Sequence, residues 1–413
     1  MKLWIDAAAA GARPRVFGMG LVERHIRGAR HRNAEPLPAI VSGGDDPSLP
    51  PALAGDAVVL SHEQGPLGAR LAAALRAGGE ALLVAAGDTA VDQRLYGELR
   101  RRRGNWMATD EDGGVALLRL EPDAPLAAIE AAADWPALIA ALGAQQGVSR
   151  LRQQDFAAHI AALRRDLPFW LRRVETEAQR AALERFMFEA SYKGSTDFFT
   201  KYVYPPLVWA AVRPLARWRV HPNTVTLVSI VLTFAAVPFF ALGWWLAGLL
   251  CAYGMSVLDS VDGKLARLTY SDSALGNLLD HGLDIVHPPL WYLGWALGLA
   301  GLGLAPYLDQ ALAEPAFQAA LALIGFYVLD RLVLAVYKAR FGRGLHAHAP
   351  VDRLARTVIS RRNINLPLFT LGLVFGLGLE TFYFIVLWQI ATVFWHAGRT
   401  AWILLRGEKP LPA

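Results

Sequence analysis

The chain has 413 residues, of which 54% are hydrophobic and 19% charged, and its formal net charge is +5. This length allows more than one domain. The single cysteine, Cys251, excludes a disulfide within the chain and argues against a cysteine-based metal site. The basic excess comes from arginine in an alanine-rich chain, and we expect no nucleic-acid partner. The N-terminus has no long apolar core after a basic start, so we expect no signal peptide.

The first part of the chain holds most of the acidic residues and alternates two kinds of pattern. Short apolar runs are typical of buried strands, and amphipathic stretches are typical of helices. The runs are 37–42, 56–61 and 80–88, the helical stretches are 65–79 and 91–103, and 105–122 reads as a hairpin turning at 112–114. We therefore predict a soluble α/β domain over residues 1–150 and a charged helical connector over 151–193.

The rest of the chain, residues 194–413, has the composition of a membrane domain. Residues 198–219 combine aromatic and basic side chains, which predicts a helix lying in the membrane interface. No charged residue occurs from Thr224 to Leu258, a length that suits two short spans. Four more apolar stretches follow, so we predict an all-α domain of six transmembrane helices within about 224–405. These stretches are 274–299, 315–336, 366–379 and 382–405.

The loops between these spans predict the orientation of the chain. Lys264 and Arg267 lie between spans two and three, and arginines are frequent between spans four and five, whereas residues 301–314 contain no lysine or arginine. By the positive-inside rule both termini face the cytoplasm. We therefore expect an integral protein of a bacterial or archaeal cytoplasmic membrane, with the N-terminal domain and the active site on the cytoplasmic side.

Four aspartates stand at helical spacing beside these apolar stretches. Asp259 and Asp262 are three residues apart and Asp280 and Asp284 are four apart, so each pair shares one helix face. A carboxylate at mid-membrane costs roughly 2.5–3.5 kcal/mol, which disfavours an accidental cluster. Hard divalent cations prefer oxygen ligands. The four aspartates therefore predict a site for Mg²⁺ or Mn²⁺, with two ions, that would hold a diphosphate.

Residues 259–284 fit the pattern D-x-x-D-G-x-x-A-R-x8-G-x3-D-x3-D at every fixed position. This sequence resembles the CDP-alcohol phosphotransferase (CDP-alcohol phosphatidyltransferase) family, and the resemblance covers about residues 195–405. It implies a transferase that moves a phosphoalcohol or phosphatidyl group from a CDP-linked donor to an acceptor hydroxyl and releases CMP, in the synthesis of phospholipids or phosphodiester solutes. It also implies a homodimer formed through the membrane domain.

The resemblance assigns roles to single residues. Asp259, Asp262 and Asp280 would bind the metal ions, and Asp284 would lie at their edge and act as general base on the acceptor hydroxyl. Small residues would let the cytidine approach the backbone, and an arginine would pair with phosphate. The implied donor-binding residues are Asn223, Thr226, Asp262, Gly263, Ala266, Arg267 and Gly276.

A run of arginines before span five has two readings. Arg353, Arg356, Arg361 and Arg362 could hold an anionic small-molecule acceptor, such as a polyol phosphate, or they could be ordinary positive-inside residues that contact anionic lipid. The Ser-Arg-Arg-Asn sequence before a span resembles the phosphatidylinositol-phosphate and di-inositol-phosphate-phosphate synthases. That resemblance favours a phosphorylated acceptor such as inositol phosphate.

The start of the chain resembles a degenerate sugar nucleotidyltransferase. Ala7, Ala8, Gly11 and Arg13 match the phosphate loop of that family, and Gly18, Leu21 and Arg24 match its second motif. Ala9 replaces a loop glycine and Met19 replaces the lysine that would neutralise phosphate charge. Asp88 resembles the metal-binding aspartate. The fusion resembles the bifunctional inositol-phosphate cytidylyltransferase and di-inositol-phosphate-phosphate synthase, but the missing lysine favours a binding or structural role.

Two other functions fit parts of the sequence. A bifunctional enzyme would retain cytidylyl transfer in the N-terminal domain, with Arg13 or Arg15 substituting for the lysine. A cation transporter would use the four carboxylates as an ion path. The transporter gives no reason for the fixed spacing of Gly263, Ala266 and Arg267. It also predicts carboxylates deep in several spans, whereas spans one, four, five and six offer at most Asp330.

Overall fold

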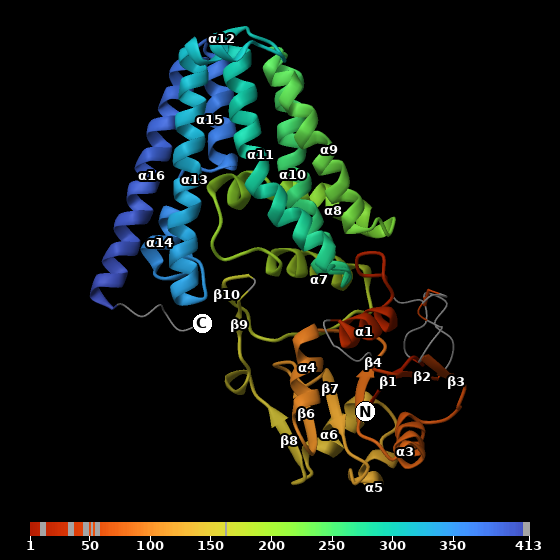
Figure 1. Cartoon of the computed structure of the whole chain (residues 1–413). Coiled ribbons are helices and arrows are strands. Elements are labelled where there is room, and N and C mark those ends of the chain that lie inside the picture. The colour runs from red at the N-terminus through yellow and green to blue at the C-terminus, as the bar shows by residue number, and fades with distance from the viewer. Residues whose placement is uncertain are drawn as a thin grey trace.

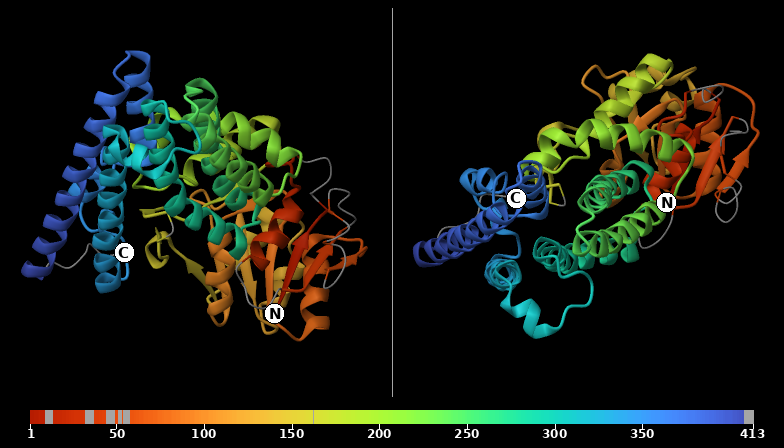
Figure 2. Two further views of the ribbon diagram at one scale, coloured as in Figure 1. Left: turned by 45° about the horizontal axis from the view of Figure 1, so that its top comes forward. Right: turned by 90° about the horizontal axis from the view of Figure 1, so that it is seen from above.

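The computed structural model describes residues 1–8, 14–31, 37–43, 49–50, 53, 58–161 and 163–407, and for residues 274–275, 277–281 and 284 it describes the helical backbone alone. An α/β part formed by the first third of the chain lies below one end of a group of long helices (Figure 1). In the turned views it lies on the side of helices α9, Pro222–Ala241, and α10, Trp245–Thr269 (Figure 2).

The α/β part contains a seven-stranded mixed sheet in the order β3-β2-β1-β4-β7-β6-β8. Neighbouring strands from β3 to β4 run parallel, and β7 runs antiparallel to both β4 and β6. Every side chain of β4 and β7 is buried, which fits the continuous apolar run of β4 and the apolar run of β7 that only Arg119 interrupts. The strands are β1 Lys2–Asp6, β2 Ala39–Ser42, β3 Val58–Ser61, β4 Leu82–Ala86, β6 Asn105–Thr109, β7 Ala116–Leu120 and β8 Val148–Leu151.

Helices cover both faces of this sheet, as predicted for an α/β domain. One core contains side chains of α1 and α4, and the other contains side chains of α3, α5 and α6. The predicted hairpin is confirmed, because β6 pairs with β7 and Gly113 adopts a left-handed φ of +71° in the turn. The helices are α1 Leu21–Arg30, α3 Leu67–Gly78, α4 Gln93–Arg101, α5 Leu126–Glu130 and α6 Trp135–Gly143.

The prediction of a helix throughout residues 151–193 is wrong for the first half of that range. Only α7, Glu177–Ala190, is an α-helix there, and it starts at a capping box formed by Thr176 and Gln179. The aromatic side chains Phe156 and Phe169 instead join the core of the sheet, which anchors the segment at two points. Before α7 lie η1 Gln153–Asp155, β9 His159–Ile160, β10 Arg165–Asp166 and β11 Leu171–Arg173, which pairs with β5 Thr89–Val91.

The predicted interfacial helix is divided in two. A single π-helical turn, η2 Phe199–Val203, precedes α8 Pro205–Arg217, because proline suits the first turn of a helix better than its interior. Val208, Val212 and Ala216 form the buried stripe of α8.

Each of the six predicted spans overlaps a helix. Three of them, α9 Pro222–Ala241, α13 Pro315–Phe341 and α16 Gly378–Arg406, are long and apolar enough to cross a membrane within the described part of the chain. The number six stays a prediction, since α10 carries charges in its last turns and α15 has only 13 residues. The remaining elements are α10 Trp245–Thr269, α11 Ala274–Ala300, α12 Leu308–Ala313, η3 Leu345–Ala347, α14 Pro350–Ala355 and α15 Arg362–Val374.

The two parts of the chain are joined by buried polar contacts at α1. Arg24 donates to the carbonyl of Leu268 at 3.1 Å, and Glu23 pairs with Arg219 at 2.8 Å. Gly18 has φ +73°, and a Cβ there would lie 2.7 Å from the carbonyl oxygen of Ala216. Only glycine fits this close approach. The turn before α1 is therefore fixed against the end of α8.

Candidate active site

Three helix ends bring the predicted donor-binding residues together. The first turn of α9 carries Asn223 and Thr226, the last turns of α10 carry the motif residues, and the first turn of α11 carries Gly276. Tyr270 ends α10 in a left-handed conformation with φ +53°. Ser273 then caps α11 by accepting a hydrogen bond from the backbone N–H of Gly276 at 3.0 Å.

A cavity of about 50 Å³ lies between these helix ends. Six of the seven predicted donor-binding residues line it, and Arg267 lies beside it, with guanidinium nitrogens 3.5 Å from the place where a Cβ of Gly263 would stand. The lining consists of Pro222, Asn223, Thr226, Asp262, Gly263, Ala266, Ser271, Asp272, Ser273 and Gly276. Motif residues from three helices thus share one concave surface.

Asp262 is held at the wall of this cavity. The hydroxyl of Thr226 donates to its Oδ2 at 2.7 Å, and both side chains are buried. A hydrogen bond to an ionised group contributes about 1.5–3 kcal/mol. Thr226 therefore fixes the direction in which the carboxylate of Asp262 points.

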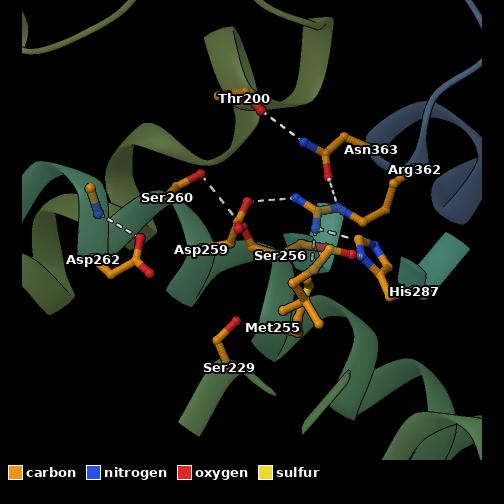
Figure 3. Close-up of polar contacts among 12 residues, drawn as sticks. Thr200, Ser229, Met255, Ser256, Asp259, Ser260, Asp262, His287, Arg362 and Asn363 are labelled. Carbon is orange, nitrogen blue, oxygen red and sulfur yellow. Dashed lines mark hydrogen bonds and ion pairs between the residues drawn. The ribbon is translucent and has the colours of Figure 1, made fainter. Parts of the chain in front are cut away.

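Asp259 belongs to a second polar network, one turn earlier on α10 (Figure 3). Its Oδ2 accepts a hydrogen bond from Nη2 of Arg362 at 2.6 Å. The same guanidinium contacts Nε2 of His287 at 3.3 Å and Oδ1 of Asn363 at 3.1 Å. Asn363 in turn donates to the hydroxyl of Thr200 at 3.0 Å. Arg362, predicted as part of an acceptor clamp, is thus engaged with a predicted metal ligand.

Asp280 and Asp284 lie on α11, but their side chains are outside the described residues. The helix confirms that both positions share a face with Gly276, because they follow it by one and two turns. Among the side chains that are described, no three of histidine, cysteine, aspartate or glutamate converge as metal ligands. The predicted four-carboxylate set stays a prediction.

Two residues of the site were missed by the sequence reasoning. Lys264 is buried, with its ammonium 3.6 Å from the centre of the Tyr192 ring, and burial together with the charges of Arg267 and Lys193 lowers its pKa to about 7. Asp272 lines the donor cavity and pairs with His31 at 2.9 Å. The polar Ser-Asp-Ser sequence between the two motif helices was the available signal for Asp272.

The predicted acceptor arginines do not form one group. Arg353 is exposed on α14, and Arg362 is bonded to Asp259. Burial, followed by the charge of Arg361, lowers the pKa of Arg356 well below its usual value. Arg353 and Arg362 thus lie in different surroundings, one at the surface and one in the network of Asp259.

The predicted nucleotidyltransferase residues are only partly described. Gly11 and Arg13, together with Ala9, lie outside the described residues. Asp88 is buried, and one of its carboxylate oxygens lies 3.3 Å from Nε of Arg173. Met19, at the position of the missing lysine, is buried as well. In the described part of this site Arg173 therefore neutralises Asp88. The apolar side chain of Met19 occupies the position of the expected lysine.

Comparisons with known proteins agree with the motif. Residues 219–397 match the family model described as CDP-alcohol phosphatidyltransferase. Inner membrane protein YnjF of Escherichia coli is 38% identical over 92 residues, which cover 22% of this chain and 44% of that protein. Human Cholinephosphotransferase 1 is 31% identical, over 34% of this chain and 36% of that protein. The Bifunctional IPC transferase and DIPP synthase of Thermococcus kodakarensis is 27% identical, over 33% and 35%.

The chain spans less than half the length of each of these three relatives. A solved structure of Mycobacterium tuberculosis phosphatidylinositol phosphate synthase (PgsA1) with CDP-DAG bound is 17% identical with a TM-score of 0.36, over 48% of this chain and 93% of that chain. The family model covers α9 to most of α16 and includes the whole aspartate motif. Residues 219–397 are therefore a domain of the CDP-alcohol phosphatidyltransferase family.

Proposed function

We propose that this chain is an integral membrane CDP-alcohol phosphotransferase. It transfers a phosphoalcohol or phosphatidyl group from a CDP-linked donor to the hydroxyl of a polyol phosphate, such as inositol phosphate, and releases CMP. The observation that carries the proposal is the cavity between α9, α10 and α11, which is lined by Asp262 and by the small residues Gly263, Ala266 and Gly276. Small residues leave room for a nucleotide to approach the backbone.

In the proposed reaction the acceptor hydroxyl attacks the phosphorus that carries the alcohol. The bond from that phosphorus to the oxygen of CMP breaks, and a phosphodiester forms. Asp284 takes the proton of the hydroxyl, and this role requires that its carboxylate lie within hydrogen-bond reach of the hydroxyl. Asp262 is oriented by Thr226 and Asp259 by Arg362, so both carboxylates are fixed before the donor binds.

The carboxylates of the motif suit a divalent metal ion. Asp259 and Asp262 present carboxylate oxygens three residues apart on α10, and Asp280 and Asp284 stand one turn apart on α11. Oxygen ligands suit Mg²⁺ or Mn²⁺. When bound, two such ions would neutralise the diphosphate and stabilise the charge of the departing CMP.

The N-terminal domain, by this proposal, supports the membrane domain and performs no cytidylyl transfer. Its Arg24, which matches a nucleotidyltransferase motif by sequence, donates to the carbonyl of Leu268 at the end of α10. Asp88 is engaged by Arg173, and Met19 offers no cation. We further propose that this domain and the donor cavity face the cytoplasm and that the protein is a homodimer.

The test is release of CMP by the purified full-length protein. CDP-diacylglycerol and CDP-alcohols are offered with inositol phosphate and other polyol phosphates, with Mg²⁺ or Mn²⁺ present. We expect CMP release that depends on both substrates and stops when a chelator exceeds the metal. Asp262→Asn should weaken metal and donor binding together. Full activity in excess chelator would contradict the metal site, and absence of CMP with every pair of substrates would contradict the function.

A further inference from the structure

The turn between α10 and α11 forms one wall of the donor cavity. Residues 271–273 line the cavity together with the motif residues. All three belong to the positions that the motif leaves unspecified before Gly276. Among the side chains that line the described cavity, Asp272 carries the only charge besides Asp262. The motif gives Asp262 a role as a metal ligand, and it gives Asp272 none.

Helix α1 of the N-terminal half holds this turn. It lies just below the lower end of α11 (Figure 1). The guanidinium of Arg24 lies over the ring of Tyr270, 5.0 Å from its centre, and donates to the Tyr270 hydroxyl at 3.3 Å. The ring of His31, at the end of α1, lies 5.8 Å from the Tyr270 ring, centre to centre. Tyr270 has a left-handed φ of +53°, which persists only where surrounding contacts support it. The contacts from α1 supply that support.

His31 also fixes the direction of Asp272. Nε2 of His31 lies 2.9 Å from Oδ1 of Asp272, and the two side chains are only 9% and 16% exposed. Water therefore screens this contact little. A carboxylate has about four lone-pair sites, so Asp272 can contact His31 and accept a hydrogen bond from a ligand at the same time.

The charge of Asp272 decides which part of a donor it can face. A CDP-linked donor has a negatively charged diphosphate and an uncharged nucleoside. A carboxylate repels phosphate oxygens, but it accepts hydrogen bonds from the ribose hydroxyls or from the amino group of cytosine. Acidic side chains bind ribose hydroxyls in this way in dinucleotide sites. Asp272 therefore suits the nucleoside, and the motif aspartates with their metal ions suit the diphosphate.

From this geometry we propose that Asp272 accepts a hydrogen bond from the nucleoside of the CDP-linked donor and that His31 positions it, so that the N-terminal half contributes to donor recognition. The inference rests on the proposed function and extends it to residues outside the family motif. Asp272 lines the cavity and binds the donor directly. His31 acts through Asp272, so it is a positioning residue.

The test is equilibrium binding to the full-length protein in phosphatidylcholine vesicles with Mg²⁺. The probes are CDP, 2′-deoxy-CDP, 3′-deoxy-CDP and UDP, and each analogue lacks one hydrogen-bond donor of the nucleoside. Asp272→Ala should raise the Kd for CDP about tenfold or more, since a hydrogen bond to a charged group is lost. The variant should bind CDP no better than the analogue that lacks the bonded group, and that analogue tells a ribose hydroxyl from the amino group of the base.

The role of His31 is tested with two substitutions and a control. His31→Ala should cause part of the same loss, and it should add nothing further to Asp272→Ala, because both changes act on one contact. His31→Gln keeps an N–H donor and should recover part of the affinity. Arg30→Ala is the matched control at the same helix end, because Arg30 donates to the carbonyl of Leu37 at 3.2 Å within the N-terminal half. It should leave CDP binding unchanged.

An equal loss of affinity for all four nucleotides in Asp272→Ala would overturn the inference, because Asp272 would then act on the diphosphate that they share. Unchanged CDP binding in this variant would also overturn it and would leave the proposed function intact. An equal loss in Arg30→Ala and His31→Ala would rule out the positioning role of His31. If Asp272→Ala shows the selective loss and no acceptor yields CMP, the nucleoside site remains and the proposed reaction fails. Absence of CDP binding to the natural protein would contradict both.

Discussion

The contact between Thr226 and Asp262 allows the donor site to be tested with an almost isosteric change. Thr226→Val removes the hydroxyl that donates to Oδ2 of Asp262 at 2.7 Å and keeps the volume of the side chain. Thr233→Val, two turns later on α9, is the matched control. The hydroxyl of Thr233 is also buried, but its hydrogen bond goes to the carbonyl of Ser229 in the same helix, at 2.8 Å.

The difference between the two variants isolates the hydrogen bond to the carboxylate. A buried hydrogen bond to a charged group contributes about 1.5–3 kcal/mol, which corresponds to about 10- to 150-fold in an equilibrium constant. We therefore expect Thr226→Val to raise the KM for the CDP-linked donor, and the Mg²⁺ concentration at half-maximal rate, about tenfold or more relative to Thr233→Val. The assay is CMP release over a series of donor and Mg²⁺ concentrations. Equal values for the two variants would refute the role of Thr226 in orienting Asp262.

Three further predictions follow from other parts of the chain. Asp284→Asn should abolish turnover and leave donor binding largely unchanged, because it removes a base but keeps its shape; near-normal turnover would rule out that base. Burial lowers the pKa of His25 from 6.5 to about 4, so stability is complete above pH 6.5 and falls by about 3 kcal/mol as the pH drops towards 4. Hydrogen exchange in β4 at several pH values should show this fall in the natural protein and not in His25→Gln. CTP with inositol phosphate should yield no pyrophosphate; release that is lost on Asp88→Ala would show a working cytidylyltransferase.

The donor cavity shows what spacing alone can predict. Gly263 and Ala266 on α10 and Gly276 on α11 are separated from Asn223 and Thr226 by most of two helices, yet all five line one cavity. The motif fixes these positions because helix periodicity decides which residues share a face, and a short turn forces two successive helices to lie near each other. Local rules were sufficient for this part of the site.

Contacts between distant segments could not be predicted in the same way. Arg362 was grouped with its neighbours in sequence, but it bonds Asp259 on another helix. Arg164 was predicted to be part of a helix, but it lies at the turn of a short hairpin. Neither segment has a periodic pattern that indicates which residues it contacts. Strands β9 and β10, for example, have two residues each. Tertiary packing decides such segments, and packing is not visible in a local window.

Hydropathy predicted where the long helices lie but did not settle which of them cross the membrane. The last turns of α10 contain Asp259, Asp262, Lys264 and Arg267, so the apolar part of that helix is shorter than its 25 residues. A helix of 13 residues, such as α15, rises about 20 Å, which is less than the hydrocarbon thickness of about 30 Å. The positive-inside rule assigns the ends of such helices to a side, but their depth depends on neighbours that the sequence does not identify.

The N-terminal half contacts the helix ends that surround the donor cavity. It reaches the site at two separate points. On the donor side His31 pairs with Asp272, which lines the cavity, and Arg24 bonds the carbonyl of Leu268 at the end of α10. A folded domain that contacts the end of α10 and the turn after it can hold the donor cavity in one geometry without any chemistry of its own, and correct orientation accounts for much of the rate of a two-substrate reaction.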